Sequence, residues 1–221
     1  MKKMKMLCLF VFWIVAISSL AQAAPVNIDF GSKYGAPPNT YGAASGQTGT
    51  WNDIRNLGIT SNLFDLDGNS TTVNITISAE TITGSSYYPG DAGLIVSDNF
   101  YVRANNSWNI SLTNLNNGIY DVYLYMPHNI AVDTGAGNVN GISFTNISGD
   151  FGGTFIQGTN YHLLTGVTIT DGTLSATGST SSFSGLAGIQ ITPAAVPIPS
   201  GIFLMASAVV GLIGIRRKLK N

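Results

Sequence analysis

Short stretches in which apolar and polar residues alternate fill the middle of this 221-residue chain. In residues 26–30, for example, Val26, Ile28 and Phe30 take every second position. Successive side chains of a β-strand point to opposite faces, so this alternation predicts strands with one buried face. Turn residues separate the stretches at intervals of about ten residues, which is typical of an all-β sandwich or barrel. Further strands are predicted at 71–78, 108–113, 119–126, 141–145, 166–170, 172–176 and 187–192.

The stretch 119–126 has the strongest period of two. Tyr120, Val122 and Leu124 share one face, and the opposite face carries Ile119 and Tyr123. A strand that is apolar on both faces is typical of the inside of a sheet. We therefore expect a central strand that is covered on both sides.

Turns and one long loop connect the predicted strands. Asp67-Gly68, residues 116–118 and Asp171-Gly172 have the composition of tight turns. The Gly-rich segment 31–50 has no apolar period. It is predicted to be an exposed loop, where binding residues are often found.

The charge of the middle region excludes one class of partner. Residues 24–195 contain only three basic residues, Lys33, Arg55 and Arg103, against all eleven Asp and Glu, a net charge of −8. Such an acidic domain repels phosphate backbones, so nucleic-acid binding is not expected. The single cysteine, Cys8, lies near the N-terminus, so no disulfide is expected in the domain.

The N-terminus has the three parts of a secretory signal peptide. Lys2, Lys3 and Lys5 precede an apolar run at 6–20, and Ala21-Gln22-Ala23 follows it. Small residues at that spacing are recognised by signal peptidase. We predict a signal helix in residues 1–23, cleavage after Ala23, and an exported domain over 24–193.

The C-terminal segment 194–221 contains a second apolar run. Residues 201–215 carry no charge, and a transmembrane helix is predicted over about 198–215. Its fifteen uncharged residues would span roughly 22 Å, which is short for a bilayer core of about 30 Å. A basic tail at 216–220 should stay in the cytoplasm and leave the domain on the other side of the membrane. The basic residues are Arg216, Arg217, Lys218 and Lys220.

This tail resembles the PEP-CTERM sorting signal of Gram-negative bacteria, which has a short proline motif, one transmembrane helix and an arginine-rich end. The motif here is Val196, Pro197, Ile198, Pro199 and Ser200. Ile198 stands where the family usually has Glu. The resemblance implies recognition by an exosortase, a membrane-embedded processing enzyme, and a role beside extracellular polysaccharide. It predicts an inner-membrane protein that reaches the cell surface or extracellular matrix after processing.

The middle region resembles the galactose-binding-like, or malectin-like, β-sandwich. The resemblance lies in the opening strand at 26–31, in the segment 110–125 with its Tyr120-Asp121-Val122-Tyr123-Leu124 run, and in a closing hairpin at 166–176 followed by 188–191. It implies a jelly roll of a kind that many carbohydrate-binding modules share. These are shape motifs, and a fold alone does not determine function.

Aromatic side chains are the candidate carbohydrate-binding residues, because sugars stack on aromatic rings. We single out Trp51, Tyr87, Tyr88 and Tyr101. The alternative for Trp51 and Tyr101 is that they fill the core of the sandwich. Tyr87 and Tyr88 lie in a stretch rich in turn residues, which favours exposure of at least one ring.

A structural calcium is the one cofactor that we consider, since no other is expected. Asp65, Asp67 and Asn69 place several oxygen ligands around Gly68, as calcium loops do. The full calcium-loop spacing is missing, and Asp67-Gly68 is also an ordinary turn. We therefore rank a turn ahead of a calcium site.

No catalytic constellation is visible in the sequence. His128 and His162 lie outside any triad or metal motif, and Glu80 is the only glutamate. We therefore predict a non-catalytic surface protein that binds polysaccharide weakly. Two alternatives stay open: a secreted polysaccharide hydrolase or lyase, and a purely structural or adhesive matrix protein.

Overall fold

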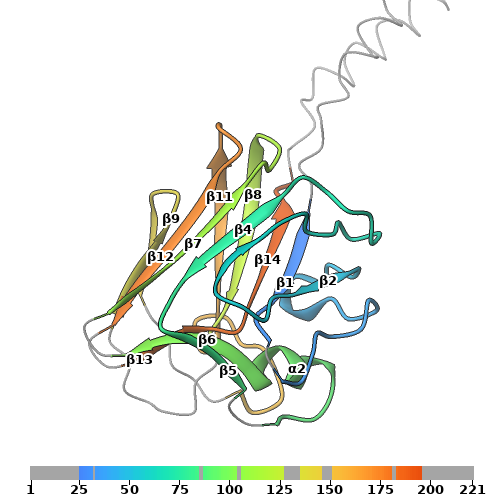
Figure 1. The fold of residues 1–221 in the computed structure, drawn as a ribbon, viewed down its shortest axis with the longest axis vertical. Helices are drawn as coiled ribbons and strands as arrows, with labels where there is room; N and C mark the ends of the chain where they lie inside the picture. Colours follow the sequence, from blue (N-terminus) through green and yellow to red (C-terminus); the bar gives the residue numbers. More distant parts are fainter. Residues whose placement is uncertain are drawn as a thin grey trace, which may run out of the picture.

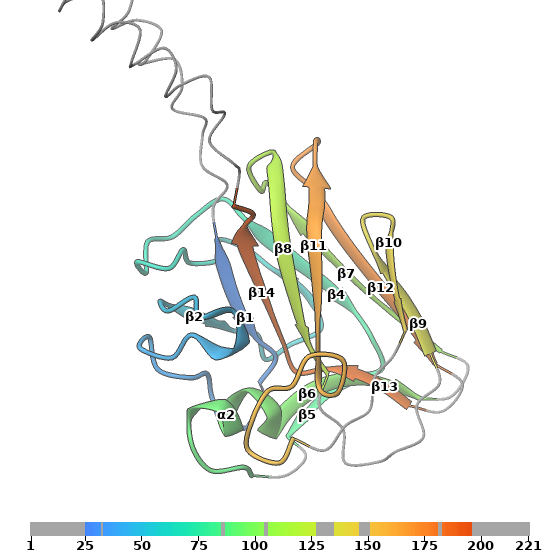
Figure 2. The same cartoon turned by 180° about the vertical axis from the view of Figure 1, so that it is seen from behind.

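The computed structural model describes residues 25–31, 33–84, 87–103, 106–126, 135–145, 151–180 and 183–195. These residues form a five-stranded, a six-stranded and a three-stranded sheet. The two larger sheets face each other, and the small sheet lies across one end of them (Figures 1 and 2). The prediction of an all-β sandwich is confirmed.

The five-stranded sheet contains the first and last strands of the domain side by side. Its order is β11 (Tyr161–Ile169), β8 (Gly118–Tyr125), β14 (Gly188–Pro193), β1 (Val26–Asp29) and β2 (Trp51–Asp53). Strand β1 is antiparallel to β14 and parallel to β2. All four residues of β1 are buried, so both of its faces are covered.

The six-stranded sheet keeps the predicted alternation. Its order is β10 (Ile142–Thr145), β9 (Gly135–Val139), β12 (Leu174–Thr180), β7 (Ser107–Thr113), β4 (Asn74–Ser78) and β3 (Gly58–Thr60). In β7, Trp108, Ile110 and Leu112 are buried, whereas Ser107 and Asn109 are exposed. One face of this sheet therefore packs on the core and the other meets solvent.

The small sheet and its helix were not predicted as such. The sheet has the order β13 (Phe183–Leu186), β6 (Asp98–Arg103) and β5 (Thr81–Gly84), and helix α2 (Asp91–Ser97) leads directly into β6. A 3-10 helix, η1 (Ala43–Ser45), interrupts the long loop. Neither helix was indicated by the sequence, which has no helical periodicity of useful length outside its two hydrophobic ends. Seven residues make about two turns, which is too short for a readable helical period.

The core is organised around a row of aromatic rings between the sheets. Phe30 packs on Phe100 at 4.8 Å between ring centroids, Phe100 on Trp108 at 5.6 Å, and Trp108 on Phe144 at 6.4 Å. These four rings come from four different parts of the chain. Their edge-on and stacked arrangements are those that aromatic side chains prefer.

One topological prediction requires correction, and a second is confirmed only in part. Residues 166–170 and 172–176 were predicted to form a hairpin, but β11 pairs with β8 and β12 pairs with β7 and β9. The turn at Gly172 therefore carries the chain from one sheet to the other. Strand β8 lies inside its sheet but second from the edge, and Ile119 at its start is 47% exposed. Local sequence indicates a turn, but not which strand pairs with which.

The predicted export and anchoring segments lie outside the described residues. These are the signal peptide at 1–23, the motif 196–200, the helix at about 198–215 and the basic tail at 216–220. Within the part of the chain that the structure describes, none of the helices combines the length and apolar character that crossing a bilayer requires.

Candidate functional site

Three aspartates meet where β1, β2 and β6 come together beside Gly31. Asp29 is the last residue of β1, and its register partner Asp53 is the last residue of β2. Asp98 is the first residue of β6. A Cβ added to Gly31 would lie 3.1 Å from Asp29 Oδ2, 3.1 Å from Asp53 Oδ1 and 3.3 Å from Asp98 Oδ2. Because β1 and β2 are parallel, the carboxylates of Asp29 and Asp53 lie at the same end of the two strands.

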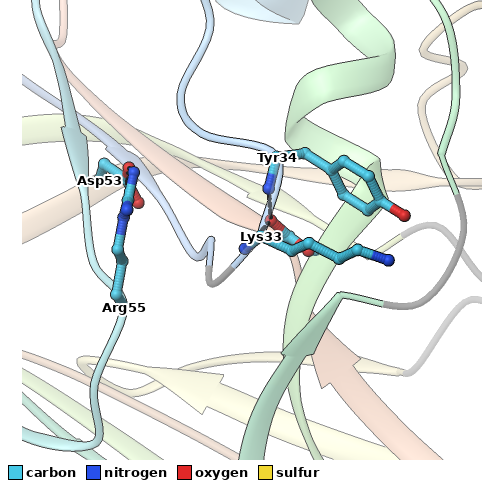
Figure 3. Close-up of polar contacts among 5 residues, drawn as sticks. Lys33, Tyr34, Asp53 and Arg55 are labelled. Carbon is cyan, nitrogen blue, oxygen red and sulfur yellow. Dashed lines mark hydrogen bonds and ion pairs between the residues drawn. The ribbon is translucent and has the colours of Figure 1, made fainter.

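Two of these carboxylates have partners from the surrounding loops. Asp98 Oδ2 accepts hydrogen bonds from the backbone N–H groups of Lys33 (3.0 Å) and Tyr34 (2.8 Å). Asp53 Oδ2 accepts hydrogen bonds from Arg55 Nε at 2.8 Å and Nη2 at 2.5 Å (Figure 3). Arg55 is the one side chain that forms an ion pair with the cluster among the described residues.

Asp29 differs from its two neighbours. Its side chain is fully buried, and neither carboxylate oxygen has a hydrogen-bond partner among the described residues. Burial raises the pKa of Asp29 well above its usual value, the negative charges of Asp53 and Asp98 raise it further, and Arg55 opposes them. A carboxyl group in this position can hold a proton or face a cation.

Sequence reasoning missed this cluster. Asp29 occupies a position of β1 that alternation assigns to the polar face, and Asp53 and Asp98 belong to no motif with it. Only Asp29 lies in a predicted strand, since none was predicted at 51–53 or 98–103, so no specific signal in the sequence linked the three residues.

A pair of tyrosines lies beside the cluster. Tyr34 supplies one of the two backbone N–H groups that bind Asp98. Its ring centroid lies 5.6 Å from that of Tyr87, and the ring planes are inclined at 52°. Tyr87 is 63% exposed and Tyr34 is half-buried. Lys33 Nζ lies 4.8 Å from the centroid of the Tyr34 ring (Figure 3). We call Lys33, Tyr34 and Tyr87 the tyrosine patch.

The other predicted sugar-binding rings are placed differently. Trp51 is only 6% exposed, and its Nε1 donates a hydrogen bond to the Tyr41 carbonyl at 3.0 Å. Tyr88 is half-buried and packs edge-on to Phe151 at 5.9 Å. Trp51 and Tyr88 both belong to a second apolar cluster, outside the main core, so the position of Trp51 fits the packing alternative.

Tyr101 lies on β6, away from this second cluster. It is half-buried, and the guanidinium group of Arg103 lies 5.8 Å from its ring centroid. Arg103 also forms an ion pair with Glu80 at 3.3 Å. The structure therefore brings Trp51 and Tyr88 together, places Tyr87 beside Tyr34, and places Tyr101 next to a charged pair.

The loop at 65–69, for which a turn was ranked ahead of a calcium site, has the hydrogen bonds of a turn. Asp65 Oδ1 accepts hydrogen bonds from the backbone N–H groups of Asp67 (3.0 Å) and Asn69 (2.8 Å), and Oδ2 accepts one from Asn69 Nδ2. These bonds, led by the one from the Asn69 backbone, lower the pKa of Asp65. Among the described residues, no group of three His, Cys, Asp or Glu side chains is arranged, as it stands, to hold a metal ion.

Comparison with known proteins adds only distant likenesses. No family model matches the chain, and no curated protein matches it. An exo-β-1,3-galactanase from Phanerochaete chrysosporium, solved with galactose, is 17% identical, with a TM-score of 0.31 over 59% of this chain and 33% of that one. The match thus spans about a third of the galactanase.

Two carbohydrate-binding modules are similarly distant. One is the CBM36-1 domain of a multidomain xylanase from the hindgut metagenome of Trinervitermes trinervoides, 12% identical, with a TM-score of 0.33 over 55% of this chain and 99% of that one. The other is TmCBM61 in complex with β-1,4-galactotriose, 14% identical, with a TM-score of 0.28 over 53% of this chain and 83% of that one.

Proposed function

We propose that this chain is a non-catalytic, exported surface protein whose β-sandwich binds extracellular polysaccharide weakly through the tyrosine patch. The observation that carries the proposal is the Tyr34–Tyr87 pair, in which an exposed ring lies against a half-buried one. A ring that is held in place by a second ring keeps its apolar face available to a sugar at little cost in side-chain entropy.

One charged donor lies against this pair and a second lies farther away. Lys33 lies against the Tyr34 ring, and Arg55 lies on the other side of the carboxylate cluster. Both side chains are exposed and donate hydrogen bonds, which sugar hydroxyl and carboxylate groups accept. The patch is an open surface of few residues, so we expect affinities in the range of weak, multivalent polysaccharide binding.

Two finer assignments belong to this proposal. We assign the sandwich to the galactose-binding-like jelly rolls on the segments 26–31 and 110–125. We also propose that the tail at 194–221 is a PEP-CTERM signal, read by an exosortase at 196–200 after the apolar helix has entered the inner membrane. The domain would then face the outside and reach the cell surface or the matrix.

A secreted polysaccharide hydrolase or lyase is the second candidate. One observation favours it: Asp29 has a raised pKa and lies beside two other carboxylates, and glycosidases use two carboxyl groups in different environments. A general acid must reach an oxygen of the substrate, whereas Asp29 has no exposed surface. Turnover of a polysaccharide by the purified chain, lost in Asp53→Asn, would favour this candidate.

Binding to a glycan array tests the proposed function. The double variant Tyr34→Ala/Tyr87→Ala should bind any recognised polysaccharide about fivefold more weakly, because a lost ring contact is worth about 1 kcal/mol. Tyr87→Phe keeps the ring and should bind like the wild type. Tyr101→Ala is the control outside the patch. Equal binding by the double variant would exclude the patch, and no binding by the wild type would leave the structural or adhesive role.

Deletion of residues 201–221 tests the delivery route. The truncated chain should move from the membrane fraction to the soluble exported fraction, because it lacks the apolar run and its basic end. In a host with an exosortase, Pro197→Ala/Pro199→Ala should block processing while leaving the protein in the membrane. A truncated chain that stays membrane-bound would contradict the anchor, and unchanged processing of the proline variant would contradict the sorting motif.

A further inference from the structure

We propose that Asp29, Asp53 and Asp98 form a calcium site beside Gly31, with the ion held between the ends of β1 and β2 and the start of β6. This inference is independent of sugar binding and uses none of the residues of the predicted calcium loop at 65–69.

The unpartnered oxygens of Asp29 point to a ligand at this place. Both of them, and Asp53 Oδ1, are buried without a hydrogen-bond partner among the described residues. An unpartnered buried carboxylate is costly, and nearly all buried polar groups in proteins have a partner. Asp29 Oδ2 and Asp53 Oδ1 are also two of the oxygens that surround the Gly31 position. The oxygens without partners therefore face the same small volume.

The charge around this volume favours a cation. Three carboxylates converge on it, and one guanidinium group, that of Arg55, compensates for them. Arg55 binds only the outer oxygen of Asp53, Oδ2, and leaves Oδ1 facing inward. The Lys33 amino group lies over the Tyr34 ring instead. A divalent ion would neutralise the charge that Arg55 leaves.

The geometry requires a rearrangement of the side chains before an ion is bound. The three oxygens lie 3.1–3.3 Å from the position that a Cβ on residue 31 would take, so they converge beside Gly31. That position is a bond length from Gly31 Cα, so an ion would lie farther from Gly31, at Ca²⁺–oxygen distances of about 2.3–2.6 Å. As they stand, the side chains do not form a metal site. The side chains would turn so that their oxygens reach these distances, and Ca²⁺ tolerates irregular geometry with six to eight oxygens. Mg²⁺ requires a near-ideal octahedron at about 2.1 Å, so it fits less well.

Gly31 and Asp53 explain how an ion would fit and enter. A Cβ on residue 31 would fill the space between the carboxylates, whereas glycine leaves it open. The Asp53 side chain is 21% exposed, and Arg55 lies between it and solvent. The ion would therefore enter past Asp53 and displace or tilt the Arg55 side chain. Main-chain carbonyls or water would complete the coordination.

Proton sharing is the competing explanation. In that case Asp29 stays neutral and donates a hydrogen bond to a neighbouring carboxylate, and calcium has no effect. The two explanations differ in what Asp29→Asn does: it removes a ligand from a calcium site, whereas it replaces a neutral acid by a neutral amide of the same shape in a proton-sharing cluster.

Calcium-dependent thermal unfolding of the full-length chain, purified in mild detergent and stripped with EDTA, tests the proposal. Calcium at about one hundred times its Kd should raise the Tm by about 5–10 °C, and magnesium should raise it much less. Terbium bound at the site should give luminescence on excitation of the nearby tyrosines, and calcium should displace it. Asp29→Asn should lose the shift and the luminescence, whereas the control Asp65→Asn should keep both.

Arg55→Gln provides a second, independent variant. Arg55 is largely exposed, so its loss should leave the fold intact, and removal of the competing positive charge should tighten calcium binding several-fold. The absence of a calcium shift in the wild type, an undiminished shift in Asp29→Asn, or weaker binding by Arg55→Gln would each overturn the proposal. If calcium has no effect and Asp29→Asn raises the Tm, proton sharing is the correct explanation.

Discussion

Trp108→Ala should lower the free energy of unfolding by about 3–5 kcal/mol, the usual cost of removing a buried aromatic side chain. Trp108 is 1% exposed and contacts the rings of Phe100 and Phe144 between the two large sheets. Its ring also covers Gly178, its register partner on β12, where an added Cβ would lie 2.3 Å from Trp108 Cε2. Gly178, opposite the indole ring, therefore has no side chain that could fill the cavity.

Chemical denaturation monitored by circular dichroism measures this change. Asn109→Ala, the next position along β7, faces solvent and should change the stability by less than about 0.5 kcal/mol. Gly178→Ala should also be destabilising, because the new methyl group would displace the indole ring. A loss in Trp108→Ala no larger than that in Asn109→Ala would mean that the sheets do not pack through this ring.

The strands with clear alternation could be predicted because their signal is local. In 107–113 and 71–78 the buried residues are those that alternation assigns to the core, with Ile75, Ile77, Ile110 and Leu112 all 2% exposed or less. This period depends only on the pleat of the backbone. The last strand was also found within a residue of its observed start.

The pairing of the strands could not be predicted in the same way. The turns at Asn117-Gly118 and Gly172 look like hairpin turns, yet each carries the chain from one sheet to the other. In the first of them, the Tyr120 hydroxyl donates a hydrogen bond to the Asn116 carbonyl at 2.6 Å and fixes the corner. Such corners depend on contacts across the sandwich, for which a short segment carries no signal.

The candidate site was missed for the same physical reason. Asp29, Asp53 and Asp98 become neighbours only because β1 pairs in parallel with β2 and because α2 directs the chain into β6. Tyr87 was identified because turn-rich segments tend to be exposed. Its partner Tyr34 was not among the rings singled out, since nothing in the sequence indicates that the two lie together.

Asn27→Ala should loosen the loop that carries Lys33 and Tyr34 of the tyrosine patch, and should destabilise the domain by about 2–3 kcal/mol. Asn27 is fully buried on β1, and its Oδ1 accepts hydrogen bonds from Gln47 Nε2 at 2.7 Å and Gln190 Nε2 at 2.9 Å. Gln190 also accepts a hydrogen bond from the Tyr125 hydroxyl, which in turn accepts one from the Ala44 N–H. The segment 31–50, predicted to be an exposed loop, is thus tied to the sheet by buried amides.

Loss of the Asn27 side chain leaves two amide groups short of an acceptor inside the protein, and the loop can restore their hydration only by lifting off the sheet. We therefore expect trypsin to cleave at Lys33 faster in Asn27→Ala than in the wild type at a temperature where both are folded. Thr48→Ala, an exposed change in the same loop, is the control. Because Tyr34 follows Lys33, glycan binding should weaken together with this protection. A loop that stays resistant in Asn27→Ala would show that contacts other than the amide network hold the tyrosine patch.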